Sequence, residues 1–244
     1  RILERPMQTT IDEIESGIYR LSTFLPAIGP TGFTFNQFLV LGEEPFLFHC
    51  GQRALFPAVS AAIGKVMDIA KLRWIGFSHV EADECGALEQ FLAAAPKAQP
   101  AVGRMGVNLW LGDTCDRPSR VLADNEVLDI GGKRLRRLDT PHVPHNWEAG
   151  MMYEETTGTL FSSDIFTQVG AAPALTESEV VSPAIQVERA MGFVSVGPNS
   201  AATLRRLGAL KPTTLAIMHG PSFRGDCAGQ LESLAQDHEK RLAA

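Results

Sequence analysis

Apolar residues recur along this chain at two spacings, and segments of the two kinds alternate. Short apolar runs bounded by turn residues predict β-strands, whereas apolar residues three and four positions apart predict amphipathic helices. The expected strands cover residues 19–25, 35–41, 45–49, 74–78, 121–138 (with a hairpin turn at 129–133), 150–153 and 159–162, and a further β segment, 215–218, leads to His219. The expected helices cover residues 54–69, 85–95, 177–191, 199–207 and 227–242. This order predicts an α/β fold, and no Pro/Ser/Gly-rich linker divides residues 1–244, so we expect a single domain.

Composition narrows the class of protein. Of the 244 residues, 45% are hydrophobic and 20% are charged, which is typical of a globular protein with a sizeable core. The net charge of −6 and the lack of a basic run argue against nucleic-acid binding. No apolar stretch has the length of a membrane span, and the N-terminus does not resemble a signal peptide. The four cysteines form no CxxC pair, so we expect reduced thiols and a cytoplasmic protein.

The segment 78–86 carries the clearest chemical signal. It places His79, Glu81 and Asp83 at alternate positions directly after the apolar run 74–77. Alternate side chains of an extended segment point the same way, so these three can converge on one point. Imidazole nitrogen combined with carboxylate oxygens is a ligand set for iron, manganese or zinc. The alternative is a polar loop followed by a helix whose first turn is acidic.

Three further donors favour the metal interpretation. His145, Asp164 and His219 each follow a strand-like run or lie in the loop after one. The carboxyl ends of strands in α/β folds meet at one edge of a sheet, where active sites commonly lie. The chain therefore offers six candidate ligands, which suit two metal ions sharing a bridging carboxylate better than a single ion.

This order of motifs resembles the metallo-β-lactamase superfamily, and most closely its flavodiiron branch with the flavodoxin-free oxygen-binding diiron proteins. Zinc hydrolases of the superfamily carry His-x-His-x-Asp-His in the first loop, whereas Glu81 stands here at the third place. The segments 33–40 and 160–166 and the closing His219-Gly220 also resemble the flavodiiron branch. The resemblance implies a metallo-β-lactamase-like αββα sandwich and a non-haem diiron centre.

The resemblance also implies a role for each donor. The implied ligands are His79, Glu81 and His145 for the first iron, Asp83 and His219 for the second, and Asp164 as the bridge. An oxo or hydroxo group would join the two irons, and zinc could substitute for them. Three anionic carboxylates favour the ferric state, so the ligand set argues for oxygen chemistry over hydrolysis.

The sequence departs from the family pattern at two positions. Glu84 stands where the family usually has His, and His49 stands where the superfamily expects a loop-bracing Asp. We expect His49 to be a structural group that supports the ligands. His142 could hydrogen-bond a bound oxygen species or could be an ordinary loop residue, and Trp147 could shield the site or belong to the core. His238, in a polar helix, is expected to be solvent-exposed.

The expected function is to bind or reduce dioxygen. Only 25 residues follow His219, too few for a flavodoxin domain, so no flavin is expected in this chain and electrons would come from a separate partner. A signalling partner and a homodimer are also compatible with the sequence. One alternative is a zinc-dependent hydrolase of an ester, lactone, thioester or phosphodiester. Another is a binding module that keeps the fold without the chemistry.

Overall fold

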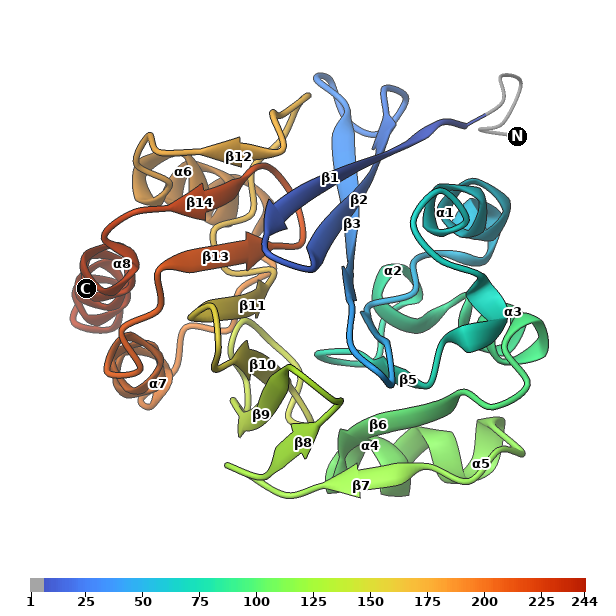
Figure 1. The fold of residues 1–244 in the computed structure, drawn as a ribbon. Coiled ribbons are helices and arrows are strands. Elements are labelled where there is room, and N and C mark those ends of the chain that lie inside the picture. Colours follow the sequence, from blue (N-terminus) through green and yellow to red (C-terminus); the bar gives the residue numbers. More distant parts are fainter. Residues whose placement is uncertain (1–6) are drawn as a thin grey trace.

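The computed structural model describes residues 7–244, which form two β-sheets of seven strands each, packed face to face (Figure 1). The first sheet has the order β1 (Thr9–Glu15), β2 (Ile18–Leu25), β3 (Phe33–Val40), β4 (Phe46–Phe48), β5 (Trp74–Gly76), β6 (Gln99–Gly103) and β7 (Arg120–Leu122). The second has the order β12 (Leu175–Thr176), β14 (Ser222–Arg224), β13 (Thr214–Ile217), β11 (Thr159–Ser163), β10 (Gly150–Glu154), β9 (Arg134–Asp139) and β8 (Val127–Asp129).

Helices cover the outer face of each sheet, which gives the predicted αββα sandwich (Figure 1). The helices beside the first sheet are α1 (Phe56–Ile63) and α3 (Leu88–Ala94), and those beside the second are α6 (Val181–Met191), α7 (Ser200–Gly208) and α8 (Cys227–Leu242). Short helical segments complete the chain: α2 (Ala82–Cys85), α4 (Arg104–Gly106), a π-helical turn (Val107–Leu111) and α5 (Gly112–Thr114). Among residues 7–244, no helix combines the length and the apolar character that crossing a lipid bilayer requires.

The alternation of side chains along each strand explains the layers. Phe46 and Phe48 of β4 point into the core between the sheets, whereas Leu47 between them packs under the helices of the first sheet. On β11, Phe161 lies between the sheets and Leu160 faces the helices of the second sheet. Each strand therefore contributes to two cores, because successive side chains of a strand lie on opposite faces. This double burial explains why these strands are short continuous apolar runs in the sequence.

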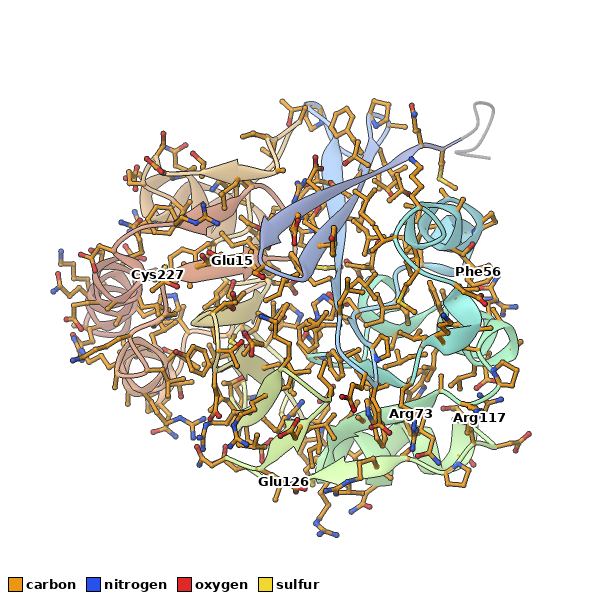
Figure 2. All side chains as sticks on the ribbon, in the orientation of Figure 1. Glu15, Phe56, Arg73, Arg117, Glu126 and Cys227 are labelled. Carbon is orange, nitrogen blue, oxygen red and sulfur yellow. The ribbon has the colours of Figure 1, made fainter. Side chains whose placement is uncertain are left out.

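A polar contact also joins the two sheets. Glu15, at the end of β1, lies against the second sheet in Figure 2. Its carboxylate accepts hydrogen bonds from Thr214 Oγ1 of β13 at 2.7 Å and from Arg224 Nε of β14 at 3.1 Å. The edge hairpin of the first sheet is thus fixed to the second sheet.

Several element boundaries differ from the sequence expectation. The predicted helix 54–69 is reduced to α1, with 3₁₀ turns at Arg53–Leu55 and Ile69–Lys71. The predicted helix 85–95 is observed as α3 alone, and a separate turn of helix, α2, precedes it. The two are interrupted where the Ala87 amide donates to the Gly51 carbonyl at 2.8 Å. The strands β1, β6, β12 and β14 were not predicted. β1 is largely polar, as an edge strand can be, and β12 and β14 span two and three residues.

The prediction that His238 is exposed was wrong. The imidazole is fully buried between α8 and α6, with Nε2 at 3.3 Å from Glu188 Oε2. Arg241 also pairs with Glu188, so α8 buries a polar group together with its charged partner. The partner lies 50 positions away in the sequence, and helical periodicity alone could not reveal it.

Glu154 at the end of β10 offers a test of how a buried carboxylate supports the second sheet. Its side chain is fully buried and accepts hydrogen bonds from the backbone and hydroxyl groups of Thr156 and Thr157, at 2.7–2.9 Å. Burial raises the pKa of Glu154, but these hydrogen bonds outweigh it, and the net shift is downward. Replacing Glu154 with Gln is therefore expected to lower the free energy of unfolding by about 1.5–3 kcal/mol at neutral pH.

Urea denaturation as a function of pH checks this expectation. Because the folded pKa is lowered, the stabilisation is complete above the unfolded pKa of about 4.3 and is lost as the pH falls below it, so wild type and Glu154→Gln should converge in acid. The neighbouring, partly exposed Glu155 is the matched control, and Glu155→Gln should change stability by about 1 kcal/mol or less. If both variants lose the same free energy of unfolding, the hydrogen bonds from Thr156 and Thr157 to Glu154 do not stabilise the fold more than the surface contacts of Glu155 do.

Candidate metal centre

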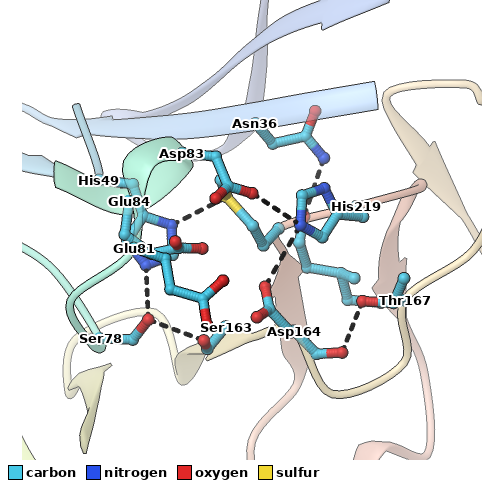
Figure 3. Close-up of polar contacts among 12 residues, drawn as sticks. Asn36, His49, Ser78, Glu81, Asp83, Glu84, Ser163, Asp164, Thr167 and His219 are labelled. Atoms are coloured by element: carbon cyan, nitrogen blue, oxygen red, sulfur yellow. Dashed lines mark hydrogen bonds and ion pairs between the residues drawn. The ribbon is translucent and has the colours of Figure 1, made fainter. Parts of the chain in front are cut away.

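Six candidate ligands meet at one end of the two sheets. Figure 3 labels four of them: Glu81, Asp83, Asp164 and His219. The strands explain this meeting, because β5, β11 and β13 all end at this edge and each is followed by a donor. Three donors remain: Glu81 directly before α2, Asp83 within α2, and His145 in the loop between β9 and β10. The donors are His79, Glu81, Asp83, His145, Asp164 and His219.

Three of the donors form a first group beside Asp164. His79 Nε2 lies 3.9 Å from Glu81 Oε1, and His145 Nε2 lies 3.0 Å from the same oxygen. Both imidazoles also approach Asp164 Oδ2, at 3.4 Å from His79 and 3.6 Å from His145. The two rings meet edge to face with centroids 4.4 Å apart. His79, Glu81 and His145 are thus close enough together to share one metal ion.

A second group lies on the other side of Asp164. His219 Nε2 lies 3.4 Å from Asp83 Oδ2 and 3.4 Å from Asp164 Oδ1. The two oxygens of Asp164 therefore face different groups: Oδ2 faces His79 and His145, and Oδ1 faces His219. This is the arrangement that a carboxylate needs in order to bridge two ions.

Hydrogen bonds orient two of the imidazoles so that Nε2 points inward. His219 Nδ1 donates to the Thr34 carbonyl at 2.8 Å, and His79 Nδ1 lies 2.9 Å from Ser78 Oγ. Metal-binding histidines commonly use the second ring nitrogen in this way. Within residues 7–244, His79 Nε2, His145 Nε2 and Asp164 Oδ1 are buried without a hydrogen-bond partner. Such groups normally have a partner, and a metal ion would supply it.

Charges within the cluster shift its ionisation. Burial lowers the pKa of His219, but contacts with the Asp164 and Asp83 carboxylates outweigh it and raise the pKa to about 10. Burial raises the pKa of Asp164, but His219 and His79 hold it well below its usual range. Burial and the nearby Asp164 and Asp83 charges raise the pKa of Glu84 well above its usual range. The cluster thus concentrates negative charge around imidazole, and a cation would relieve it.

Strand β3 fixes the loop that carries His219. The Asn36 side chain, fully buried, donates to the carbonyls of Ile217 and Gly220 at 2.8 and 2.9 Å, and its backbone amide donates to Met218 O at 3.0 Å. Figure 3 shows Asn36 beside His219. The sequence signal for Asn36 was its place between aromatic residues in the segment 33–40, but its role in holding this loop becomes visible only in the fold.

His49 supports the first group from behind. It is fully buried, with Nε2 3.0 Å from Ser78 Oγ and Nδ1 3.0 Å from Met218 Sδ (Figure 3). Ser78 Oγ in turn contacts His79 Nδ1 and accepts a hydrogen bond from Ser163 Oγ at 2.7 Å. Burial lowers the pKa of His49 to about 3, so the imidazole is neutral. Both ring nitrogens of His49 thus have protein partners, and its supporting role stays a prediction.

A cavity of about 450 Å³ opens onto the donors. Phe33, Met191 and Phe193 supply its apolar wall, and no sequence pattern marked the last two as site residues. Trp147 does not line this cavity and is 58% exposed, so the structure shows neither the shielding nor the core role considered for it. His142 is also exposed and borders a separate cavity, of about 660 Å³, with Asp139 and Arg206 among its other lining residues. It is therefore not placed to contact a molecule in the donor cavity.

Comparison with known proteins identifies relatives over most of the chain. A rubredoxin-oxygen oxidoreductase of Megalodesulfovibrio gigas is 26% identical over 210 residues, which are 81% of this chain and 51% of that protein. A Synechocystis sp. protein provisionally named diflavin flavoprotein A 2 is 23% identical over 217 residues, which are 86% of this chain and 37% of that protein. The chain thus spans about a third to a half of the length of these curated relatives.

Solved structures share the same architecture. A flavo di-iron protein variant of Thermotoga maritima superposes with a TM-score of 0.82 at 21% identity, over 95% of this chain and 63% of that one. A fragment of a Nostoc sp. diflavin flavoprotein superposes with a TM-score of 0.83 at 16% identity, over 98% of this chain and all of that one. At this level of identity, the likeness shows the fold. The sequence model described as ODP family beta lactamase matches residues 33–207, and the chain therefore belongs to that family.

Proposed function

We propose that this chain holds two iron ions at the cluster and uses them to bind or reduce dioxygen. In this proposal His79, Glu81 and His145 hold the first iron, Asp83 and His219 hold the second, and Asp164 bridges the pair. The observation that carries the proposal is the position of the Asp164 carboxylate. Its two oxygens face separate groups of donors, at distances of 3.4–3.6 Å. Residues 1–244 would act as one metallo-β-lactamase-like domain.

The donor set suits iron. It combines three imidazole nitrogens with three carboxylates, and anionic oxygen donors stabilise the ferric state. The buried donor atoms that lack hydrogen-bond partners, such as His79 Nε2 and Asp164 Oδ1, are those that would point at the ions. Bound iron would supply the electrons and the binding position for dioxygen.

The protein's own groups would provide orientation and shelter. The Thr34 carbonyl and Ser78 hold the His219 and His79 rings, so little reorganisation is needed when the site is loaded. Phe33, Met191 and Phe193 give the cavity an apolar wall that suits a small uncharged molecule.

The names of relatives support dioxygen chemistry. They include a rubredoxin-oxygen oxidoreductase, a coenzyme F420H(2) oxidase and an anaerobic nitric oxide reductase flavorubredoxin. All three names describe redox reactions, and none describes hydrolysis, so they do not favour the zinc-dependent hydrolase. We further propose that electrons reach the site from a separate donor protein, and that a homodimer is the working form.

Metal loading followed by exposure to air tests the proposal. Anaerobic protein titrated with ferrous iron is expected to bind about two ions per chain, and air should then produce a new visible absorption band and consume dioxygen. With a chemical reductant present, an oxygen electrode distinguishes continuous reduction from binding alone. Iron-loaded protein that neither changes its spectrum nor takes up oxygen would overturn the proposal. Zinc at both positions with turnover of an ester or thioester would instead establish a hydrolase.

A further inference from the structure

Glu84 is a buried acidic residue beside the six candidate ligands. It lies in α2, one position after Asp83, where the resemblance noted in the sequence leads us to expect histidine. The backbone of this turn is fixed, since the Glu84 carbonyl accepts hydrogen bonds from Cys50 N at 2.8 Å and from Cys50 Sγ at 3.4 Å. The direction of the Glu84 side chain is thus set by the fold.

That direction is inward. The Glu84 side chain is fully buried, and neither of its carboxylate oxygens has a hydrogen-bond partner among residues 7–244. Glu188, also fully buried, differs because its Oε2 contacts both His238 and Arg241. An ionised carboxylate buried without a partner is strongly unfavourable, so Glu84 either stays protonated or has a cation beside it.

The distances around Glu84 fit a shared metal ion better than a hydrogen bond. Glu84 Oε2 lies 3.8 Å from His79 Nε2, which is too long for a hydrogen bond. Donor atoms held about 2.0–2.2 Å from one ion are separated from each other by roughly 3–4 Å. His79 Nε2 also lacks a hydrogen-bond partner. His79 Nε2 and Glu84 Oε2 are therefore both free to bind the same ion.

Glu84 also belongs to both sides of the cluster. It forms one group with His79 and Asp164 and another with Asp83 and His219, and in each group the donor atoms lie within 4.8 Å of one another. Asp164 is the bridging residue of the proposed centre, and Glu84 of α2 lies within reach of donors on both sides of it. Figure 3 shows Glu84 beside Asp83 and Glu81.

We propose that Glu84 is a seventh metal ligand, a fourth carboxylate placed between the two metal positions; this inference rests on the proposed diiron site. Two ferrous ions carry four positive charges, which four carboxylates neutralise, whereas three carboxylates leave one positive charge. Glu84 therefore makes the site more favourable for ferric ions than a site with histidine at this position.

Four variants of the full chain test the assignment. Glu84→Gln and Glu84→Ala remove the anionic ligand, and Glu84→His replaces it with a different metal ligand. Glu188→Gln removes a buried carboxylate that pairs with His238 and Arg241 and is not among the candidate donors. The measurements are anaerobic titration with ferrous iron and the Mössbauer spectrum of ⁵⁷Fe-loaded protein. Circular dichroism and melting temperature establish that each variant is folded.

We expect Glu84→Gln and Glu84→Ala to bind the second iron at least about tenfold more weakly and to change the Mössbauer quadrupole splitting. Glu84→His should recover binding of the second iron with a different spectrum, and Glu188→Gln should match wild type. If Glu84→Gln or Glu84→Ala binds iron with wild-type affinity and spectrum, Glu84 is not a ligand, while the diiron proposal stands. If wild type binds no iron, the diiron proposal fails and this assignment fails with it.

Discussion

Replacing Asp164 with asparagine is expected to abolish the paired iron site and to leave at most about one ion per chain. Asp164 is the residue whose two carboxylate oxygens face different histidines, with Oδ2 toward His79 and His145 and Oδ1 toward His219. An amide of the same size offers one uncharged oxygen, and its NH₂ group would face a metal or an imidazole. Asp164→Asn therefore removes the bridging carboxylate and one negative charge, and the volume of the side chain stays nearly the same.

The loss of affinity should exceed the roughly 10–100-fold that follows removal of a group supporting a ligand. Anaerobic titration with ferrous iron measures it, and the visible band formed in air should disappear with it. Asp237→Asn is the matched control, because Asp237 is also buried but pairs with Arg189 and Arg241 on α6 and α8. Binding of two ions by folded Asp164→Asn would show that Asp164 is not the bridge.

Replacing Phe161 with alanine is expected to lower the free energy of unfolding by about 3–5 kcal/mol. Phe161 lies on β11 in the core between the sheets and is fully buried. Its ring contacts Phe38 of β3 and Phe48 of β4, with centroids 5.6 and 5.4 Å apart, so one side chain fills the space between both sheets. The cavity left by alanine would be bounded by two rigid strands on the opposite sheet and could not collapse fully.

Urea denaturation of the metal-free proteins measures the effect of Phe161→Ala, and working without metal separates packing from metal binding. Leu242→Ala is the control, since it removes a large apolar side chain that is 47% exposed at the end of α8. That change should alter stability by only about 0.5 kcal/mol. Similar losses for the two variants would mean that the core between the sheets is not what holds the sandwich together.

Much of the fold followed from local patterns. The hairpin of β8 and β9, the strands β10 and β11 and the helix α8 were predicted because their periodicity and turn residues are local features. Of the missed strands, β1 is largely polar, β12 and β14 are short, and β6 contains Pro100; all four form because a neighbouring strand offers hydrogen bonds. The interruption between α2 and α3 likewise depends on Gly51, whose carbonyl accepts from the Ala87 amide. Hydrogen bonds between residues far apart in the sequence leave no pattern in the residues on either side of them.

The sequence by itself determined which donors this protein has and that each of them follows a strand, because residue type and periodicity are properties of the chain. It also indicated their meeting at one edge, since strand ends in such folds lie together. The resemblance implied that Asp164 is the bridge, and the tertiary structure places its two oxygens toward different donors. Only the tertiary structure decided that Glu84 is buried among them. It also decided that Met191 and Phe193 wall the cavity while His142 turns away from it. These outcomes depend on which distant elements pack together, and that packing is governed by the burial of both sheets rather than by any local pattern.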